Sequence, residues 1–152
     1  MRYWFQDHHA LAPETAAAFY EISLRWAAER GTAFALTMYP RDYGRFADIE
    51  RFAALGAATW TRRPDEDVVE VVGAVSDELV DTLFHSLMPM GAVTGDLCPV
   101  RDLRVLCGKR VLYRLSEYGR DQVLELDGDE LAALSARLFE AGLGAELLWP
   151  AP

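Results

Sequence analysis

The fold is decided by residues 103–115, whose sequence is LRVLCGKRVLYRL. Two runs rich in leucine, valine and tyrosine flank a turn at Gly108, and this pattern predicts a β-hairpin. A three-residue loop over 108–110 leaves one face of the hairpin wholly apolar, whereas a two-residue loop would mix the two faces. Burial therefore selects the longer loop. The resulting pairs are Leu103 with Leu115, Val105 with Tyr113, and Cys107 with Val111.

The chain after the hairpin predicts a third strand and a helix. Residues 122–126 continue the antiparallel meander. Asp127 is followed three residues later by Glu130, the spacing of a capping box, which predicts a helix over 128–141. Two glycines, Gly142 and Gly144, end that helix.

The chain before the hairpin alternates between strand and helix patterns. Pro13 suits the first position of a helix and Gly31 suits its C-terminal end. The β-branched run over 68–75 is the strongest strand pattern. Residues 89–102 have no apolar period, and a connection of this length is often functional. Strands are predicted at 2–6, 33–39, 57–62, 68–75 and 145–149, and helices at 13–30, 43–55 and 76–88.

Together these elements predict an α+β fold with mixed α/β character, in one globular domain over residues 1–152. We expect a mixed sheet of about five to seven strands with about four helices. An N-terminal βαβ unit opens the fold, and the C-terminal antiparallel meander is followed by a helix.

The composition narrows the classes of function. A net charge of −9 disfavours binding of nucleic-acid phosphates and of anionic membranes, and it permits a basic partner. No apolar run approaches the roughly 20 residues of a membrane span, and no signal peptide is visible, so we expect a cytoplasmic protein. Fourteen arginines beside a single lysine are typical of a GC-rich bacterial genome. No cofactor or metal motif is present, so neither is predicted, and a homo-oligomer is compatible with the sequence.

An acidic segment supports the first functional hypothesis. Residues 64–100 contain eight acids and no lysine or arginine, and such a segment can steer a basic partner into contact. The hypothesis is a protein-binding module, in composition like bacterial inhibitor or immunity proteins, that masks a basic partner. The alternative is that these acids only keep the protein soluble and are neutralised by residues 101–120. The predicted partner-binding residues are Asp65, Glu66, Asp67, Glu70, Asp77, Asp81, Met90 and Val93.

An arginine pair supports a second hypothesis. The hairpin register places Arg104 directly opposite Arg114, and like charges in that position are destabilising unless an anion lies between them. The pair therefore predicts a site for a carboxylate or phosphate ligand, as in a small-ligand binding or sensor domain. The alternative is neutralisation by Glu125, which should face the same side.

A third hypothesis is an enzyme, and the sequence does not decide it. Asp7, His8 and His9 form one acid–histidine cluster, which can supply a general base or a metal ligand. His85 and Cys98 are a candidate base and nucleophile, although a buried, inert Cys98 is the alternative. Separately, three tryptophans on weak or edge-like strands would be interface anchors if they are exposed. They are Trp4, Trp60 and Trp149.

Overall fold

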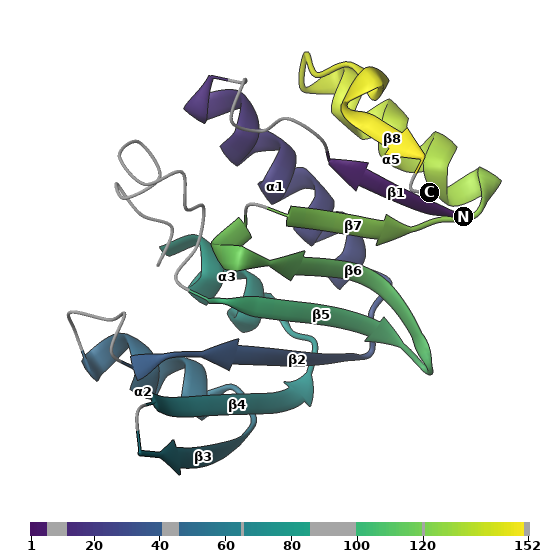
Figure 1. Ribbon diagram of the computed structural model, residues 1–152. Helices are drawn as coiled ribbons and strands as arrows, with labels where there is room; N and C mark the ends of the chain where they lie inside the picture. Colours follow the sequence, from purple (N-terminus) through teal and green to yellow (C-terminus); the bar gives the residue numbers. More distant parts are fainter. Residues whose placement is uncertain (6–11, 41–45, 65, 86–99, 120, 151–152) are drawn as a thin grey trace.

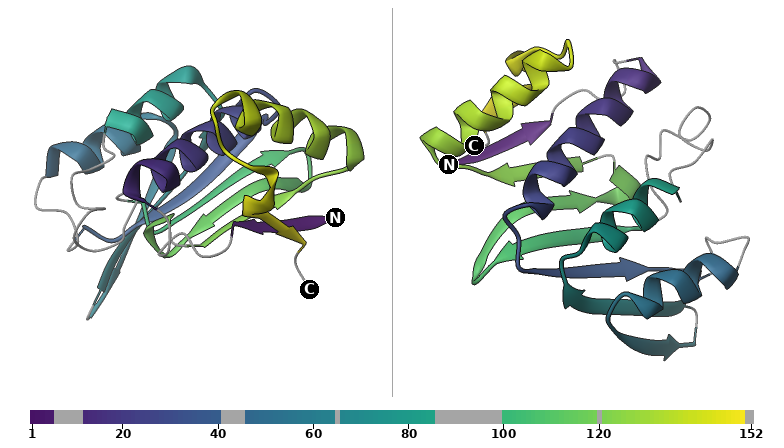
Figure 2. Two further views of the ribbon diagram at one scale, coloured as in Figure 1. Left: turned by 90° about the horizontal axis from the view of Figure 1, so that it is seen from above. Right: turned by 180° about the vertical axis from the view of Figure 1, so that it is seen from behind.

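The computed structural model describes residues 1–5, 12–40, 46–64, 66–85, 100–119 and 121–150. They form one twisted eight-stranded sheet with four α-helices packed on one of its faces (Figures 1 and 2). The other face of the sheet carries no helix within the described ranges (Figure 2, left). The fold is therefore α+β, as predicted.

The observed elements follow the predicted ones closely. Strands β1 to β8 span Arg2–Phe5, Ala33–Met38, Ala57–Arg63, Glu66–Ala74, Asp102–Cys107, Arg110–Ser116, Asp121–Glu125 and Leu148–Pro150. Helices α1, α2, α3 and α5 span Pro13–Ala28, Phe46–Ala54, Asp77–His85 and Gly128–Glu140. Within the described residues two short 3-10 helices, η3 and η4, span Glu117–Gly119 and Ala145–Leu147. The strand predicted at 145–149 therefore begins only at Leu148. The predicted Met90, Val93 and Cys98 of the long connection lie outside the described residues, as do Asp7, His8, His9 and Asp65.

The local signals at the helix ends act as expected. Pro13 occupies the start of α1. At α5 the Asp127 carboxylate accepts a hydrogen bond of 2.8 Å from the Glu130 backbone N–H. The Glu130 carboxylate in turn accepts one of 2.9 Å from the Asp127 N–H. The capping box predicted from the sequence is thus confirmed, and it satisfies two backbone donors that the helix itself leaves unpaired.

The sheet differs from the predicted one in its connectivity. Its strand order is β3-β4-β2-β5-β6-β7-β1-β8, and all seven pairings are antiparallel, so a mixed sheet of five to seven strands was not the right description. The predicted strand–helix–strand opening is present. Because the direction alternates at each step, β1 and β2 run parallel, but the meander β5-β6-β7 lies between them. β1 and β2 therefore do not pair with each other as in a βαβ unit, and each has antiparallel neighbours instead.

The β5–β6 hairpin confirms the predicted register over its open end and departs from it near the turn. Leu103 pairs with Leu115 and Val105 with Tyr113, as predicted. Beyond a register shift the pairs are Leu106 with Val111 and Cys107 with Arg110, so the turn has two residues, with Gly108 at φ 59°. The extra residue, Leu112, is a bulge that restores the alternation of faces, which is why the shorter turn does not mix them.

The core lies between the helices and the covered face of the sheet. It is built from α1 aromatics, among them Phe19, Tyr20 and Trp26, and from alternate strand residues such as Phe34 and Tyr113, all fully buried. The residues between them on each strand point to the open face, because successive side chains of a strand alternate. The open face is where the remaining, mostly polar, strand residues gather.

Candidate ligand-binding site

One row of paired residues crosses the open face of the sheet from edge to edge. The printed pairings place the row in register from one edge strand to the other, and residues directly paired in a sheet share a face. The tryptophans are at one end, a pair of arginines is in the middle, and small or aliphatic residues follow. From β8 to β3 the row is Trp149, Trp4, Val123, Arg114, Arg104, Ala35, Val72 and Ala57.

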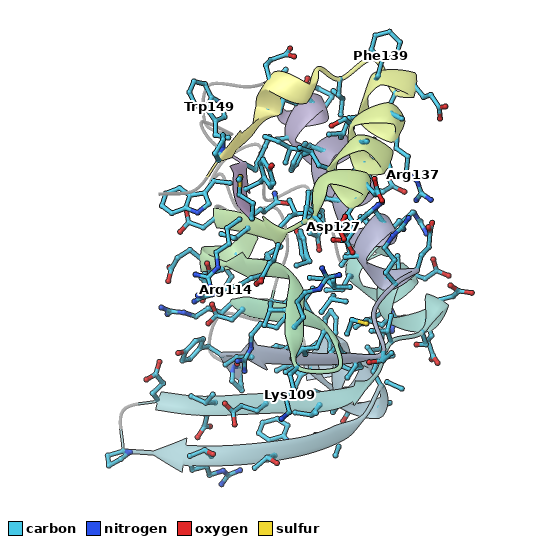
Figure 3. The ribbon with its side chains drawn as sticks, turned by 90° about the vertical axis from the view of Figure 1, so that its right-hand side faces the viewer. Lys109, Arg114, Asp127, Arg137, Phe139 and Trp149 are labelled. Carbon is cyan, nitrogen blue, oxygen red and sulfur yellow. The ribbon has the colours of Figure 1, made fainter. Side chains whose placement is uncertain are left out.

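The arginine pair predicted from the sequence is confirmed. Arg104 of β5 is directly opposite Arg114 of β6, and both side chains are exposed. Figure 3 shows Arg114 pointing away from the helical layer. Like charges in this position repel one another.

The predicted neutralisation by Glu125 is not formed. The register of β6 with β7 pairs Arg114 with Val123 and so places Glu125 on the same face, as expected. Yet among the described residues no carboxylate oxygen lies within the 4.0 Å of an ion pair from either arginine. Glu125 instead is opposite Arg2 of β1.

The twisted sheet makes a hollow of about 870 Å³ around this pair. Five basic side chains and two acidic ones line it, in a chain whose net charge is −9. The basic ones are Arg2, Arg104, Lys109, Arg110 and Arg114, and the acidic ones are Asp102 and Glu125. Trp4, Val111, Val123, Ala35 and Thr37 complete the lining.

Arg110 is already engaged from the helical side. Its guanidinium donates two hydrogen bonds to the Glu130 carboxylate, one of them 3.0 Å long from Nη1 to Oε2. This pairing raises the pKa of Arg110 and, on the other side, lowers the pKa of Glu130. Because Glu130 is also the capping-box residue of α5, the contact ties the hairpin to that helix. The positive charge open to a ligand therefore comes from Arg2, Lys109, Arg104 and Arg114.

Sequence reasoning found the arginine pair but not its companions. Lys109 lies in the hairpin turn (Figure 3), and Arg2 and Trp4 come from β1, which joins the sheet beside β7. A signal for Lys109 was present in its position at the tip of a predicted hairpin. No local signal points to Arg2 or Trp4, because their place depends on a pairing across more than 115 residues.

The predicted partner-binding acids are dispersed. Glu66 and Asp67 begin β4, where they are opposite Arg63 and Arg62 of β3. Glu70 is opposite Thr37 on the open face. The other two, Asp77 and Asp81, belong to α3, which packs on the helical side of the sheet. The structure therefore does not gather the described acids into one patch, and binding of a basic protein stays a prediction.

The enzyme candidates remain untested. His85 is the last residue of α3, and its side chain is not described. Within the described ranges no group of three or more histidine, cysteine or acidic side chains is placed to hold a metal ion. Cys107, at the end of β5, is exposed as a free thiol.

Comparison with protein family models, with curated proteins and with solved structures gives no significant match. Among the described residues, no helix combines the length and the apolar character needed to cross a membrane. The three predicted anchor tryptophans are indeed exposed, at 46% for Trp4, 44% for Trp60 and 55% for Trp149. Of these, Trp4 lines the hollow.

Proposed function

We propose that this protein binds a small anionic ligand in the hollow on the open face of its sheet. The observation that carries the proposal is the arginine pair. Arg104 and Arg114 are held directly opposite each other, with no carboxylate within ion-pair distance among the described residues. An anion between them would replace a repulsion by two attractions.

The chemistry of the lining suits an oxyanion. A guanidinium presents a planar fork of N–H donors that matches the oxygens of a carboxylate or phosphate. Two such forks on directly opposed residues, together with Lys109 and Arg2 of the same lining, can supply both charge and hydrogen bonds to one ligand. With Arg110 paired to Glu130, the four other cations exceed the two acids of the lining by a formal charge of two, although the whole chain has a net charge of −9.

The dispersion of the acidic residues is why the geometry favours a ligand over the masking of a basic partner. The described acids of the 64–100 segment lie on both layers of the fold, whereas the cations of the hollow converge on one surface. A binding or sensor domain is the class of function that such a surface serves.

Thermal unfolding in the presence of anions tests the proposal. A ligand that binds only the folded state stabilises it by about 2.7 kcal/mol at 100 times its Kd. We expect inorganic phosphate to raise the Tm of the natural chain, and the double substitution Arg104→Gln with Arg114→Gln to remove that increase. The matched control is Arg51→Gln, at an exposed position on α2 in the other layer, which should keep it. An equal increase in all three proteins would mean that the arginine pair is not the site.

A further inference from the structure

The aromatic end of the residue row narrows the ligand class. Trp4 pairs with Val123, and Val123 pairs with Arg114, so two strand steps separate the indole-bearing residue from the arginine pair. At about 4.8 Å per step, the backbone positions of Trp4 and Arg114 are roughly 10 Å apart. Val123 lies between them with a small apolar side chain. The hollow therefore has an aromatic wall on the β1 side of its central arginine pair.

Trp4 is more exposed than is usual for a large apolar side chain inside a sheet. Its side chain is 46% exposed although it sits one strand in from the edge, beside β8. The edge strand adds a second exposed tryptophan, Trp149, directly opposite Trp4, and Figure 3 shows Trp149 on the side away from the helices. A large flat apolar side chain beside cations is a stacking platform for a planar ring.

The charges around the hollow favour a small, doubly charged ligand over a single carboxylate and over a long polyanion. Four basic side chains without an ion pair among the described residues suit a dianion such as a phosphate monoester more than a single carboxylate. The same face carries Asp121 and Glu70 beyond the hollow, by the alternation along β7 and β4. A long polyanion would run onto these acids, whereas a compact phosphate stays among the cations.

We propose that the ligand joins a planar ring to a phosphate group, as a nucleoside monophosphate does, with the ring against Trp4 and the phosphate between Arg104 and Arg114. This rests on the proposed function, because it assigns the other half of the same ligand. It adds a specific role for Trp4 that an anion site alone does not need.

The experiment compares four probes by calorimetric titration and by tryptophan fluorescence. They are adenosine monophosphate, ribose 5-phosphate, adenosine and a single-stranded oligonucleotide. Stacking of a base on an aromatic side chain predicts that the nucleotide binds about tenfold to a hundredfold tighter than ribose 5-phosphate. We expect Trp4→Leu to remove this difference, so that the nucleotide binds no more tightly than ribose 5-phosphate.

Matched variants separate the ring from the fold. Trp60→Leu removes a tryptophan of nearly equal exposure, 44%, from β3, the strand at the other edge of the sheet. It should change neither the affinity for the nucleotide nor that for ribose 5-phosphate. Trp4→Phe keeps a ring and should retain most of the difference. The comparison of nucleotide with sugar phosphate in the natural chain needs no variant, so it decides the matter even if Trp4→Leu fails to fold.

Each outcome points to a different conclusion. Equal affinities for the nucleotide and ribose 5-phosphate would contradict the proposed contact between the ring and Trp4, and would still support the anion site. Binding of neither phosphate, or of adenosine as tightly as of its phosphate, would overturn the anion site as well. If the oligonucleotide binds more tightly than the mononucleotide, the proposal of a small ligand is wrong and the protein binds a nucleic acid.

Discussion

Arg137 on α5 donates two hydrogen bonds, of 2.8 and 2.7 Å, to the carboxylate of Glu29, which directly follows α1 and lies 108 residues earlier in the chain. The two helices lie side by side over the sheet, and this bidentate contact fixes the C-terminal end of one against the last turn of the other (Figure 2). The hydrogen bond from Arg137 lowers the pKa of Glu29, an effect that burial partly opposes.

We expect Arg137→Gln to destabilise the fold only modestly and only where Glu29 is ionised. Both side chains are partly exposed, at 38% and 51%, so the loss should be about 0.2 to 1 kcal/mol. Because the folded-state pKa of Glu29 lies below its usual 4.5, this stability is present above that value and is lost as the pH falls through the folded-state pKa. Urea unfolding at pH 7 and pH 3 measures it. The same loss at both pH values would assign the effect to packing of the arginine stem.

The capping residues of α5 offer a second test. Asp127→Ala removes a side-chain acceptor for a backbone N–H and should cost about 1 kcal/mol in the free energy of unfolding. Asp129→Ala, in the same first turn but outside the capping box, is the control and should cost less. Thermal unfolding of the two variants side by side gives the comparison. Equal losses would mean that first-turn charge matters more than the cap.

Glu130 couples that helix to the hollow, so one substitution should move stability and binding in opposite directions. Glu130→Gln keeps an amide that can serve the capping box but removes the charge that pairs with Arg110. The hollow then gains one unpaired cation. We expect a small loss of stability together with tighter binding of phosphate, by a few-fold, in calorimetric titration. Weaker binding would show that Glu130 supports the site by holding Arg110 in place.

We expect the repulsion between Arg104 and Arg114 to lower the free energy of unfolding of the protein when no ligand is bound. Arg114→Gln removes a cross-strand repulsion and is expected to raise the free energy of unfolding by about 0.2 to 1 kcal/mol in the absence of anions. Salt screens the repulsion, so the gain should shrink as a non-binding salt is added. Denaturant unfolding at low and high ionic strength checks this. A variant less stable than the natural chain would mean that the arginine stem packs on the sheet and outweighs its charge.

Recognition of a basic protein through the acidic segment remains a separate prediction. Charge reversal of Glu66 and Asp67 to lysine should slow association with such a partner, and the difference should fall as salt is raised. A pull-down from the source cells at two salt concentrations would supply the partner, and stopped-flow mixing would give the rates. The hypothesis would be wrong if the pull-down recovers no partner, or if the charge reversal leaves the association rate unchanged.

Much of the fold followed from local pattern, and the site followed only in part. The β5–β6 register, the α5 cap and the element bounds depend on alternation and on residues a few positions apart, so short stretches predict them. The bulge at Leu112 was missed because a longer turn satisfies the same burial pattern. The position of β1 was out of reach, since four residues at one end of the chain contain no signal for the strand that they pair with. Arg2 and Trp4 were therefore not connected to the arginine pair.

That position of β1 has a consequence for how the protein folds. Among the described strands, β1 pairs with β7 and β8, whose residues lie more than 110 positions further along the chain. Such distant pairings form slowly because a long loop must close first. The meander β5-β6-β7 brings Arg104 and Arg114 together through short turns, so we expect it to form before β1 joins the sheet. We expect Trp4 and Trp149 to take their places only when β1 and β8 pair. A form of the protein in which β1 is still unpaired would then hold Arg104 and Arg114 without Trp4, and it would lack the residue that we propose to contact the ring of the ligand.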